Sequence, residues 1–208
     1  MNFQPLVYKY QSSGNPKAPT LVLLHGTGGD ERDLIPLAKN FGNQFNLLSL
    51  RGNVSENGMP RFFKRLGMGV FDEEDLKFRT HEMVHFIKEI ASVEGFDLSQ
   101  LIALGYSNGA NIAGSTLMLY PDFLSAAILF RPMLPYKKTP DFKTNKKVPV
   151  FISAGSYDEM VSASEIKTYT ALLDKNNFST ELHQLPTGHN LTHDDLSLAV
   201  KWTQNLGL

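Results

Sequence analysis

The chain has 208 residues, 42% of them hydrophobic and 20% charged, a composition typical of one soluble globular domain spanning residues 1–208. Its 20 basic and 21 acidic residues give a net charge of −1, which argues against nucleic acid or an anionic membrane as the main partner. Cysteine is absent, which excludes disulfides, thiolate nucleophiles and thiolate metal sites.

The chain also lacks the sequence features of export or membrane insertion. The first residues do not combine a basic stretch with an apolar one, as a secretory signal does. No apolar run approaches the roughly 18 residues that a membrane span needs. We therefore expect a cytoplasmic protein that acts on a small molecule.

Short apolar runs alternate with amphipathic stretches along the whole chain, which predicts βαβ units and a mostly parallel sheet of about seven strands with helices on both faces. Strands are expected at residues 6–10, 20–24, 45–50, 101–104, 126–130, 148–153 and 180–185. Helices are expected at residues 33–40, 72–93, 108–120, 163–175 and 192–205. Asp30 and Thr192 each stand three residues before an aspartate, a pattern typical of helix starts. Residues 52–69 and 131–147 are predicted to be irregular loops after strand ends, where such a sheet builds its site.

A glycine-rich loop, His-Gly-Thr-Gly-Gly at residues 25–29, follows the second expected strand. It lacks the G-x-G-x-x-G spacing and the Gly-Lys-Ser/Thr sequence of nucleotide-binding loops, so a bound nucleotide is not expected. Its amides can instead stabilise negative charge on a reacting carbonyl oxygen, with Thr27 as the expected donor. His25 is expected to brace this loop by hydrogen bonds.

Several large apolar side chains lie in a glycine- and arginine-rich segment at residues 59–71. They fit either core or subunit contacts or the lining of an acyl or alcohol pocket. As pocket candidates we take Met59, Phe62, Phe63, Met68 and Phe71. The acidic run at residues 72–75 suits a helix start, and His81 and His85 lack the H-E-x-x-H arrangement, so no metal site is expected.

The motif Gly-Tyr-Ser-Asn-Gly at residues 105–109 directly follows an apolar strand and opens a helix. A serine nucleophile on such a turn takes a strained conformation with positive φ, which leaves no room for side chains two residues away. The motif alone also fits a helix entry without chemistry. As a catalytic turn it makes Ser107 the nucleophile and the Asn108 amide a second donor to the oxyanion.

A serine nucleophile needs a base and an acid to orient that base. Asp158 lies just past the expected strand at 148–153, where the acid belongs in chain order, and His189 lies in the loop after the last strand, where the base belongs. His193, in the first turn of the final helix, is the nearest alternative base. Asp194 and Asp195 are expected to interact with the dipole of that helix.

These four ordered motifs, at residues 25–29, 105–109, 155–158 and 188–189, resemble the small carboxylesterase/phospholipase family of α/β hydrolases, which includes acyl-protein thioesterases and bacterial carboxylesterases. The resemblance covers nearly the whole chain and implies an α/β-hydrolase fold and compatibility with a homodimer. So short a chain is expected to carry no large lid domain, and the expected reaction needs no cofactor. Residues 51–54, 61–65 and 71–76 look most like a bacterial carboxylesterase subgroup sometimes linked to the response to hydroquinones and related electrophiles. Two departures bear on substrate preference only: Ser162 stands where the family often has proline, and Asn108 where many members have glutamine.

The expected function is that of a serine carboxylesterase, which hydrolyses small or short-acyl esters through an acyl-enzyme intermediate. Ser107 would attack, His189 transfer the proton, Asp158 orient His189, and the Thr27 and Asn108 amides hold the oxyanion. Two alternatives stay open: an acyl thioesterase or lysophospholipase, and a ligand-binding or sensing protein that keeps the same residues.

Overall fold

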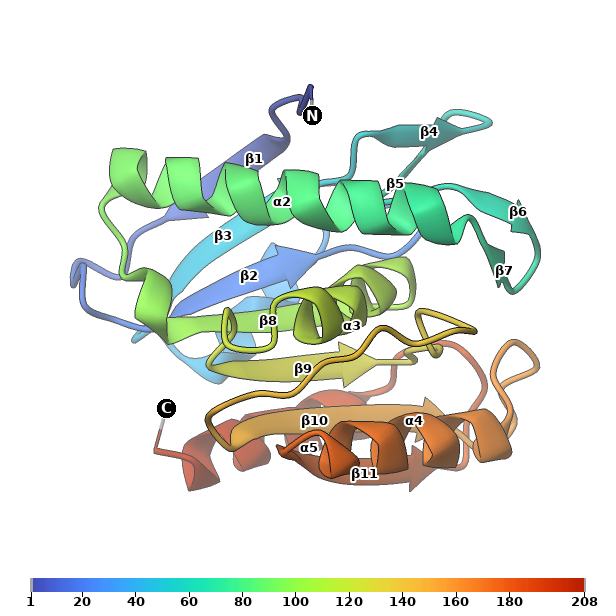
Figure 1. Cartoon of the computed structure of the whole chain (residues 1–208). Helices are drawn as coiled ribbons and strands as arrows, with labels where there is room; N and C mark the ends of the chain where they lie inside the picture. The colour runs from blue at the N-terminus through green and yellow to red at the C-terminus, as the bar shows by residue number, and fades with distance from the viewer. Residues whose placement is uncertain (1, 208) are drawn as a thin grey trace.

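A computed structural model describes residues 2–207, in which seven strands form one sheet in the order β1-β3-β2-β8-β9-β10-β11 (Figure 1). The strands are β1 Val7–Gln11, β2 Thr20–Leu24, β3 Asn46–Arg51, β8 Leu101–Tyr106, β9 Ala126–Phe130, β10 Val148–Gly155 and β11 Phe178–Leu185. β1 pairs antiparallel with β3, and all other neighbours in this sheet are parallel. The predicted mostly parallel sheet of seven strands is confirmed.

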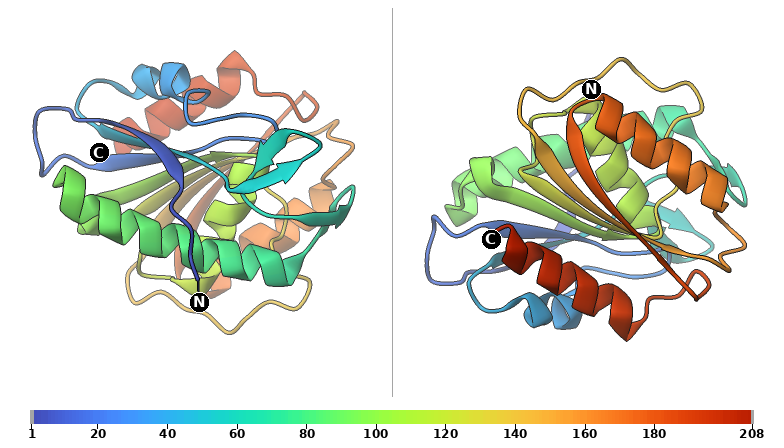
Figure 2. Two further views of the ribbon diagram at one scale, coloured as in Figure 1. Left: turned by 90° about the horizontal axis from the view of Figure 1, so that it is seen from above. Right: turned by 90° about the horizontal axis from the view of Figure 1, so that it is seen from below.

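Helices cover both faces of this sheet, as predicted, with α2, α3 and α4 on one face and α1 and α5 on the other (Figure 2). Their bounds are α1 Ile35–Ala38, α2 Glu73–Glu94, α3 Asn108–Leu119, α4 Ala163–Lys175 and α5 His193–Asn205, with 3-10 turns η1 Lys39–Phe41 and η2 Leu98–Gln100. The α-helix predicted at residues 33–40 is shorter in the structure, because α1 covers only Ile35–Ala38 and continues as the 3-10 turn η1. The Asp30 carboxylate accepts from the Arg32 amide, so it makes a local turn and does not cap a helix.

Two other helix starts follow the predicted chemistry. Asp72 precedes α2 and its carboxylate accepts from the Asp75 amide at 3.0 Å, so the acidic run begins a helix. Thr192 precedes α5 and forms a capping box with Asp195. No helix within residues 2–207 has both the length and the apolar character to cross a membrane.

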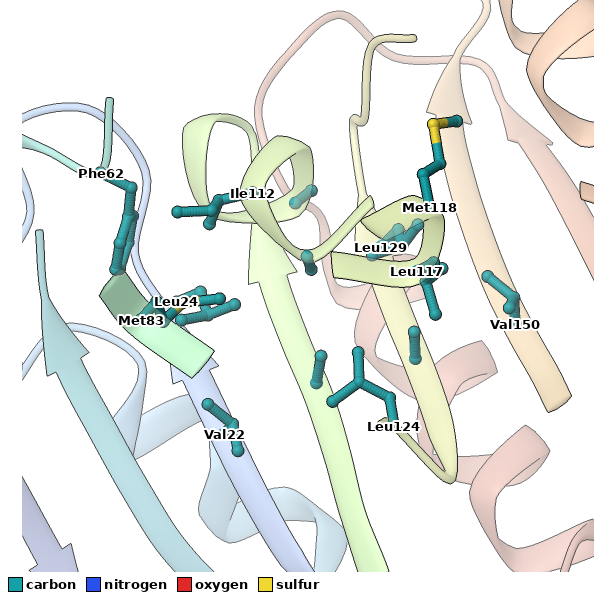
Figure 3. Packing of buried hydrophobic residues seen from close by; sticks show 14 of the residues in the cluster. Val22, Leu24, Phe62, Met83, Ile112, Leu117, Met118, Leu124, Leu129 and Val150 are labelled. Carbon is teal, nitrogen blue, oxygen red and sulfur yellow. The ribbon is translucent and has the colours of Figure 1, made fainter. Parts of the chain in front are cut away.

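Each face of the sheet buries its own hydrophobic cluster. The cluster under α2, α3 and α4 includes strand residues such as Val22 and Leu129 and helix residues such as Met83 and Ile112 (Figure 3). The cluster under α1 and α5 includes Trp202. Central strands buried on both faces explain the continuous apolar runs of the sequence.

Residues 52–69 are not irregular, which corrects the prediction for this segment. They contain the antiparallel pair β4 Val54–Glu56 and β5 Met59–Arg61, followed by β6 Arg65–Gly67, which pairs with β7 Val70–Phe71. Asn57 and Gly58 turn the first hairpin with φ of 53° and 81°, the two positive values that a tight Asn-Gly hairpin turn requires. Both hairpins lie at the end of the sheet toward which the parallel strands point (Figure 1). Residues 131–147 contain no helix or strand, as predicted.

Candidate active site

Ser107 occupies the sharp turn between β8 and α3, with φ of 52° and ψ of −112°. This strained conformation is the one expected of a serine nucleophile. A Cβ on Gly105 would lie 2.6 Å from the Ala110 nitrogen, and a Cβ on Gly109 would overlap the carbonyl oxygen of Leu24. The two glycines therefore allow the turn because α3 starts directly against the strands.

Ser107, His189 and Asp158 form one hydrogen-bonded chain, although they come from three distant parts of the sequence. His189 Nε2 lies 2.8 Å from Ser107 Oγ, and His189 Nδ1 lies 2.8 Å from Asp158 Oδ2. A carboxylate only accepts, so Nδ1 carries the proton and Nε2 presents its lone pair to the serine hydroxyl. The Asp158 side chain is only 2% exposed, and its other oxygen accepts from the Met160 amide at 2.9 Å. The Asp158 carboxylate is thus fixed and shielded from water.

His25 lies inside the glycine-rich loop and is 1% exposed. Its Nδ1 lies 2.6 Å from the Gly26 carbonyl oxygen and so carries the proton, and its Nε2 accepts from the Gly52 amide at 3.1 Å. Burial lowers the pKa of His25, which favours this neutral state. His25 therefore braces the loop, as expected, and takes no part in the serine chain.

The side chains of Thr27 and Asn108 are bonded by Arg61, the last residue of the hairpin that sequence reasoning missed, and by Phe62, the residue after it. The Thr27 hydroxyl accepts from Arg61 Nη1 at 2.7 Å, and Asn108 Oδ1 accepts from the Phe62 amide at 2.7 Å. Within residues 2–207 the backbone amides of Thr27 and Asn108 have no hydrogen-bond acceptor, so both are free to donate to a ligand. The arrangement can stabilise an oxyanion near Ser107.

The five pocket candidates fall into three environments. Phe62 and Phe63 are 2% and 0% exposed and belong to the hydrophobic core, whereas Met59 and Met68 are 39% and 71% exposed. Phe71 packs edge-on against Phe63 and lines a pocket of about 190 Å³. Of the five, Phe71 is the one that the structure brings into this pocket.

Apolar residues after β9, which sequence reasoning did not select, form much of the wall of this pocket. They are Met133, Leu134 and Pro135, and the charged residues Glu73, Lys137 and Glu165 line the same pocket. The Met133 amide donates to Asn111 Oδ1 at 2.7 Å, which joins the pocket wall to the first turn of α3, the helix that Ser107 precedes. Their signal in the sequence was present but weak: an apolar stretch in a loop that follows a central strand.

Arg131 and Asp195 were also missed as part of this site. Arg131 follows β9, is 1% exposed, and pairs with Asp195 at 2.7 Å. Asp195 does lie in the first turn of α5, as expected, but its carboxylate is buried. The only hint in the sequence was a charged residue directly after a fully apolar strand. Among residues 2–207 no group of three or more histidine or acidic side chains is arranged to bind a metal ion.

The mostly parallel sheet covered on both faces, with a strained serine turn after a central strand, defines an α/β hydrolase. No segment of the described chain forms a large lid over it. The sequence profile of the phospholipase/carboxylesterase family matches residues 8–206. The chain belongs to this family, so it is a member of a group of hydrolases and carboxylesterases.

Individual relatives agree with this assignment over nearly their whole length. The putative hydrolase MhqD of Bacillus subtilis is 44% identical over 198 residues, covering 94% of this chain and 96% of that protein. The crystal structure of a Bacillus cereus carboxylesterase superposes with a TM-score of 0.93 at 42% identity, covering 96% of this chain and 94% of that one. A Mesorhizobium loti carboxylesterase superposes with a TM-score of 0.89 at 28% identity, covering 96% and 94% of the two chains.

Proposed function

We propose that the protein is a serine carboxylesterase that hydrolyses small or short-acyl esters through an acyl-enzyme intermediate. The observation that carries the proposal is the chain of two 2.8 Å contacts from Ser107 through His189 to Asp158. The same three residues could serve a binding protein, but the carboxylesterases among the similar structures favour hydrolysis.

The geometry supports acyl transfer in two steps. Ser107 Oγ attacks the ester carbonyl carbon while its proton moves to His189 Nε2, and the positive charge on the imidazole is stabilised by Asp158. The Thr27 and Asn108 amides stabilise the oxyanion. The tetrahedral intermediate collapses, the alcohol leaves with the proton from His189, and water then attacks the acyl-enzyme with His189 again as base.

We take the pocket that Phe71 and Met133 line as the candidate acyl site. Ser107, Asp158 and His189 do not line it, and its link to them is the Met133 amide, which bonds Asn111 in the first turn of α3. The pocket volume of about 190 Å³ is below the range of roughly 300–1,000 Å³ of pockets for drug-sized ligands, which fits a short acyl group. We place Met59 at the entrance, because its side chain would contact a Cβ built on Gly28, the residue after Thr27. Met68, strongly exposed on the next hairpin, is proposed as part of the same rim.

The direct test is hydrolysis of p-nitrophenyl acetate and labelling by a fluorophosphonate. Ser107→Ala and His189→Ala are expected to lose both by at least about 10⁴-fold, because neither the nucleophile nor its base remains. Ser92→Ala removes an exposed serine of α2 and serves as the control. Full hydrolysis by Ser107→Ala would contradict the proposal.

Two outcomes would redirect the proposed function and leave the family unchanged. Faster turnover of acyl thioesters or lysophospholipids than of oxygen esters of equal chain length would make the protein a thioesterase or lysophospholipase. Labelling without turnover of any ester would favour ligand capture by a sensing protein.

A further inference from the structure

Arg131 combines two features that each cost free energy of folding: a strained backbone and a buried charge. It follows β9 with φ of 55°, a left-handed conformation that is uncommon for a long side chain. Its side chain is also among the largest in the described chain to be fully buried. A buried guanidinium needs a partner for each of its donors, so the residues it contacts indicate what it does.

The guanidinium bonds the backbone on both sides of His189. Nε donates to the Gly188 carbonyl at 3.1 Å, and Nη2 donates to the Asn190 carbonyl at 3.0 Å. The carbonyl of His189 itself accepts from the Tyr106 hydroxyl at 3.2 Å. Three consecutive carbonyls of one loop are therefore each bonded by a side chain that follows or ends a central strand.

Tyr106 suits this role because it remains a donor. Burial raises the pKa of its phenol, so the hydroxyl keeps its proton over the range in which the protein would be assayed. Its ring also lies with its centroid 5.8 Å from that of the His189 imidazole. Tyr106 thus contacts both the backbone and the ring of the same residue.

Asp195 balances the charge of Arg131 and links it to α5. Its two carboxylate oxygens accept from Nη1 and Nη2 at 2.7 and 2.8 Å, and it also accepts from Ser153 and Thr192. Burial alone would raise the pKa of Asp195, but the hydrogen bonds from Arg131 and Ser153 outweigh burial and lower it. The pair is therefore an ionised, fully bonded anchor beneath the His189 loop.

We infer that Arg131 and Tyr106 are positioning residues for His189, which fix its backbone so that the ring stays within reach of Ser107 and Asp158 at once. The inference deepens the proposed function and rests on it. One hydrogen bond to Asp158 can orient the ring about its own bonds but cannot fix the position of the Cα. The bonds to residues 188–190 supply that constraint.

Arg131→Lys separates this role from a purely structural one. Lysine keeps a positive charge opposite Asp195, but one compact ammonium cannot reach Gly188, Asn190 and Asp195 together. Arg79→Lys is the matched control, because Arg79 pairs with the buried Glu82 at 2.7 Å on α2, away from the His189 loop. Tyr106→Phe removes only the bond to the His189 carbonyl and no buried charge, so it serves if Arg131→Lys does not fold.

The kinetic readout is hydrolysis of p-nitrophenyl acetate. For Arg131→Lys we expect kcat to fall about 10²-fold with KM changed by less than about threefold, and for Tyr106→Phe we expect a fall in kcat of about tenfold. Arg79→Lys is expected to keep the kcat of the unaltered chain. Wild-type kcat in both Arg131→Lys and Tyr106→Phe would overturn the inference, as would a loss in Arg79→Lys equal to that in Arg131→Lys at equal stability.

The second readout does not depend on any substrate. In protein labelled with ¹⁵N-histidine, the Nδ1–H signal of His189, assigned by its loss in His189→Ala, reports the bond to Asp158. We expect this signal to broaden or disappear in Arg131→Lys and to persist in Arg79→Lys; a signal unchanged in Arg131→Lys would overturn the inference. If the unaltered chain hydrolysed no ester but the signal changed in Arg131→Lys alone, the proposed function would fail and the positioning of His189 would stand.

Discussion

Asn108 offers the sharpest test of the oxyanion arrangement, because its side chain and its backbone do different things. The side-chain oxygen accepts from the buried Phe62 amide, while the side-chain nitrogen has no hydrogen-bond partner among residues 2–207. Asn108→Ala leaves the Phe62 amide unpaired and should lower the free energy of unfolding by about 1–3 kcal/mol. Asn108→Asp keeps the acceptor and removes no existing bond, but it places a charge at a position only 2% exposed, so it should also lower the free energy of unfolding.

The activity of Asn108→Asp should fall for a different reason. A carboxylate roughly 5 Å from an oxyanion, at an effective dielectric constant of about 20, repels it by about 3 kcal/mol. Such a rise in the barrier lowers kcat about 10²-fold. Urea unfolding measures the first effect, and hydrolysis of p-nitrophenyl acetate at pH 8 measures the second. If Asn108→Asp turned over the ester at the wild-type rate, the oxyanion would not form beside Asn108; if Asn108→Ala were as stable as the unaltered chain, the bond to Phe62 would not matter.

Three further predictions concern stability. Tyr169 is fully buried and its hydroxyl has no hydrogen-bond partner among the described residues. Tyr169→Phe should therefore raise the free energy of unfolding by about 1 kcal/mol and raise Tm by about 2–4 °C in calorimetry. A lower Tm would show that the hydroxyl is bonded. Gly109→Ala places a Cβ onto the Leu24 carbonyl and should cost more than about 3 kcal/mol in urea unfolding, so an unchanged midpoint would contradict the packing described. The pKa of buried His25 is lowered from 6.5, so the unfolded chain takes up a proton that the folded chain does not. The free energy of unfolding should therefore fall as the pH drops below about 6.5. Urea unfolding of His25→Asn between pH 8 and 5 should show a smaller dependence of this free energy on pH than the unaltered chain shows. An equal dependence on pH in both proteins would refute the prediction.

The parts of the fold that were predictable from sequence are those encoded by local patterns. The strand before Ser107 is a continuous apolar run, and the helix after it begins at once, so the turn was visible within ten residues. The order of motifs then located Asp158 and His189, because parallel strands bring their carboxyl ends to one edge. The structure places the three side chains in contact.

The parts that were not predictable depend on pairings between distant residues. Arg131 and Asp195 are 64 positions apart, and nothing near either one distinguishes a buried pair from a solvated charge and a helix-start aspartate. The hairpin at residues 54–61 is a different case, because the Asn57-Gly58 pair is a local signal that predicts a tight hairpin turn from the sequence alone. That hairpin matters because its last residue, Arg61, and the next residue, Phe62, bond the side chains of Thr27 and Asn108, whose amides are the proposed oxyanion donors.

Two residues with strained backbones lie at the ends of neighbouring strands in this site. Ser107 and Arg131 directly follow Tyr106 and Phe130, which are register partners on the neighbouring strands β8 and β9, and both have positive φ, at 52° and 55°. Each such conformation costs about 1–3 kcal/mol. The two side chains reach the same loop, one to the His189 ring and the other to the carbonyls beside it. Relaxing either turn would therefore move the Ser107 hydroxyl away from the His189 ring, and the buried bonds of Arg131 offset the strain of its own turn.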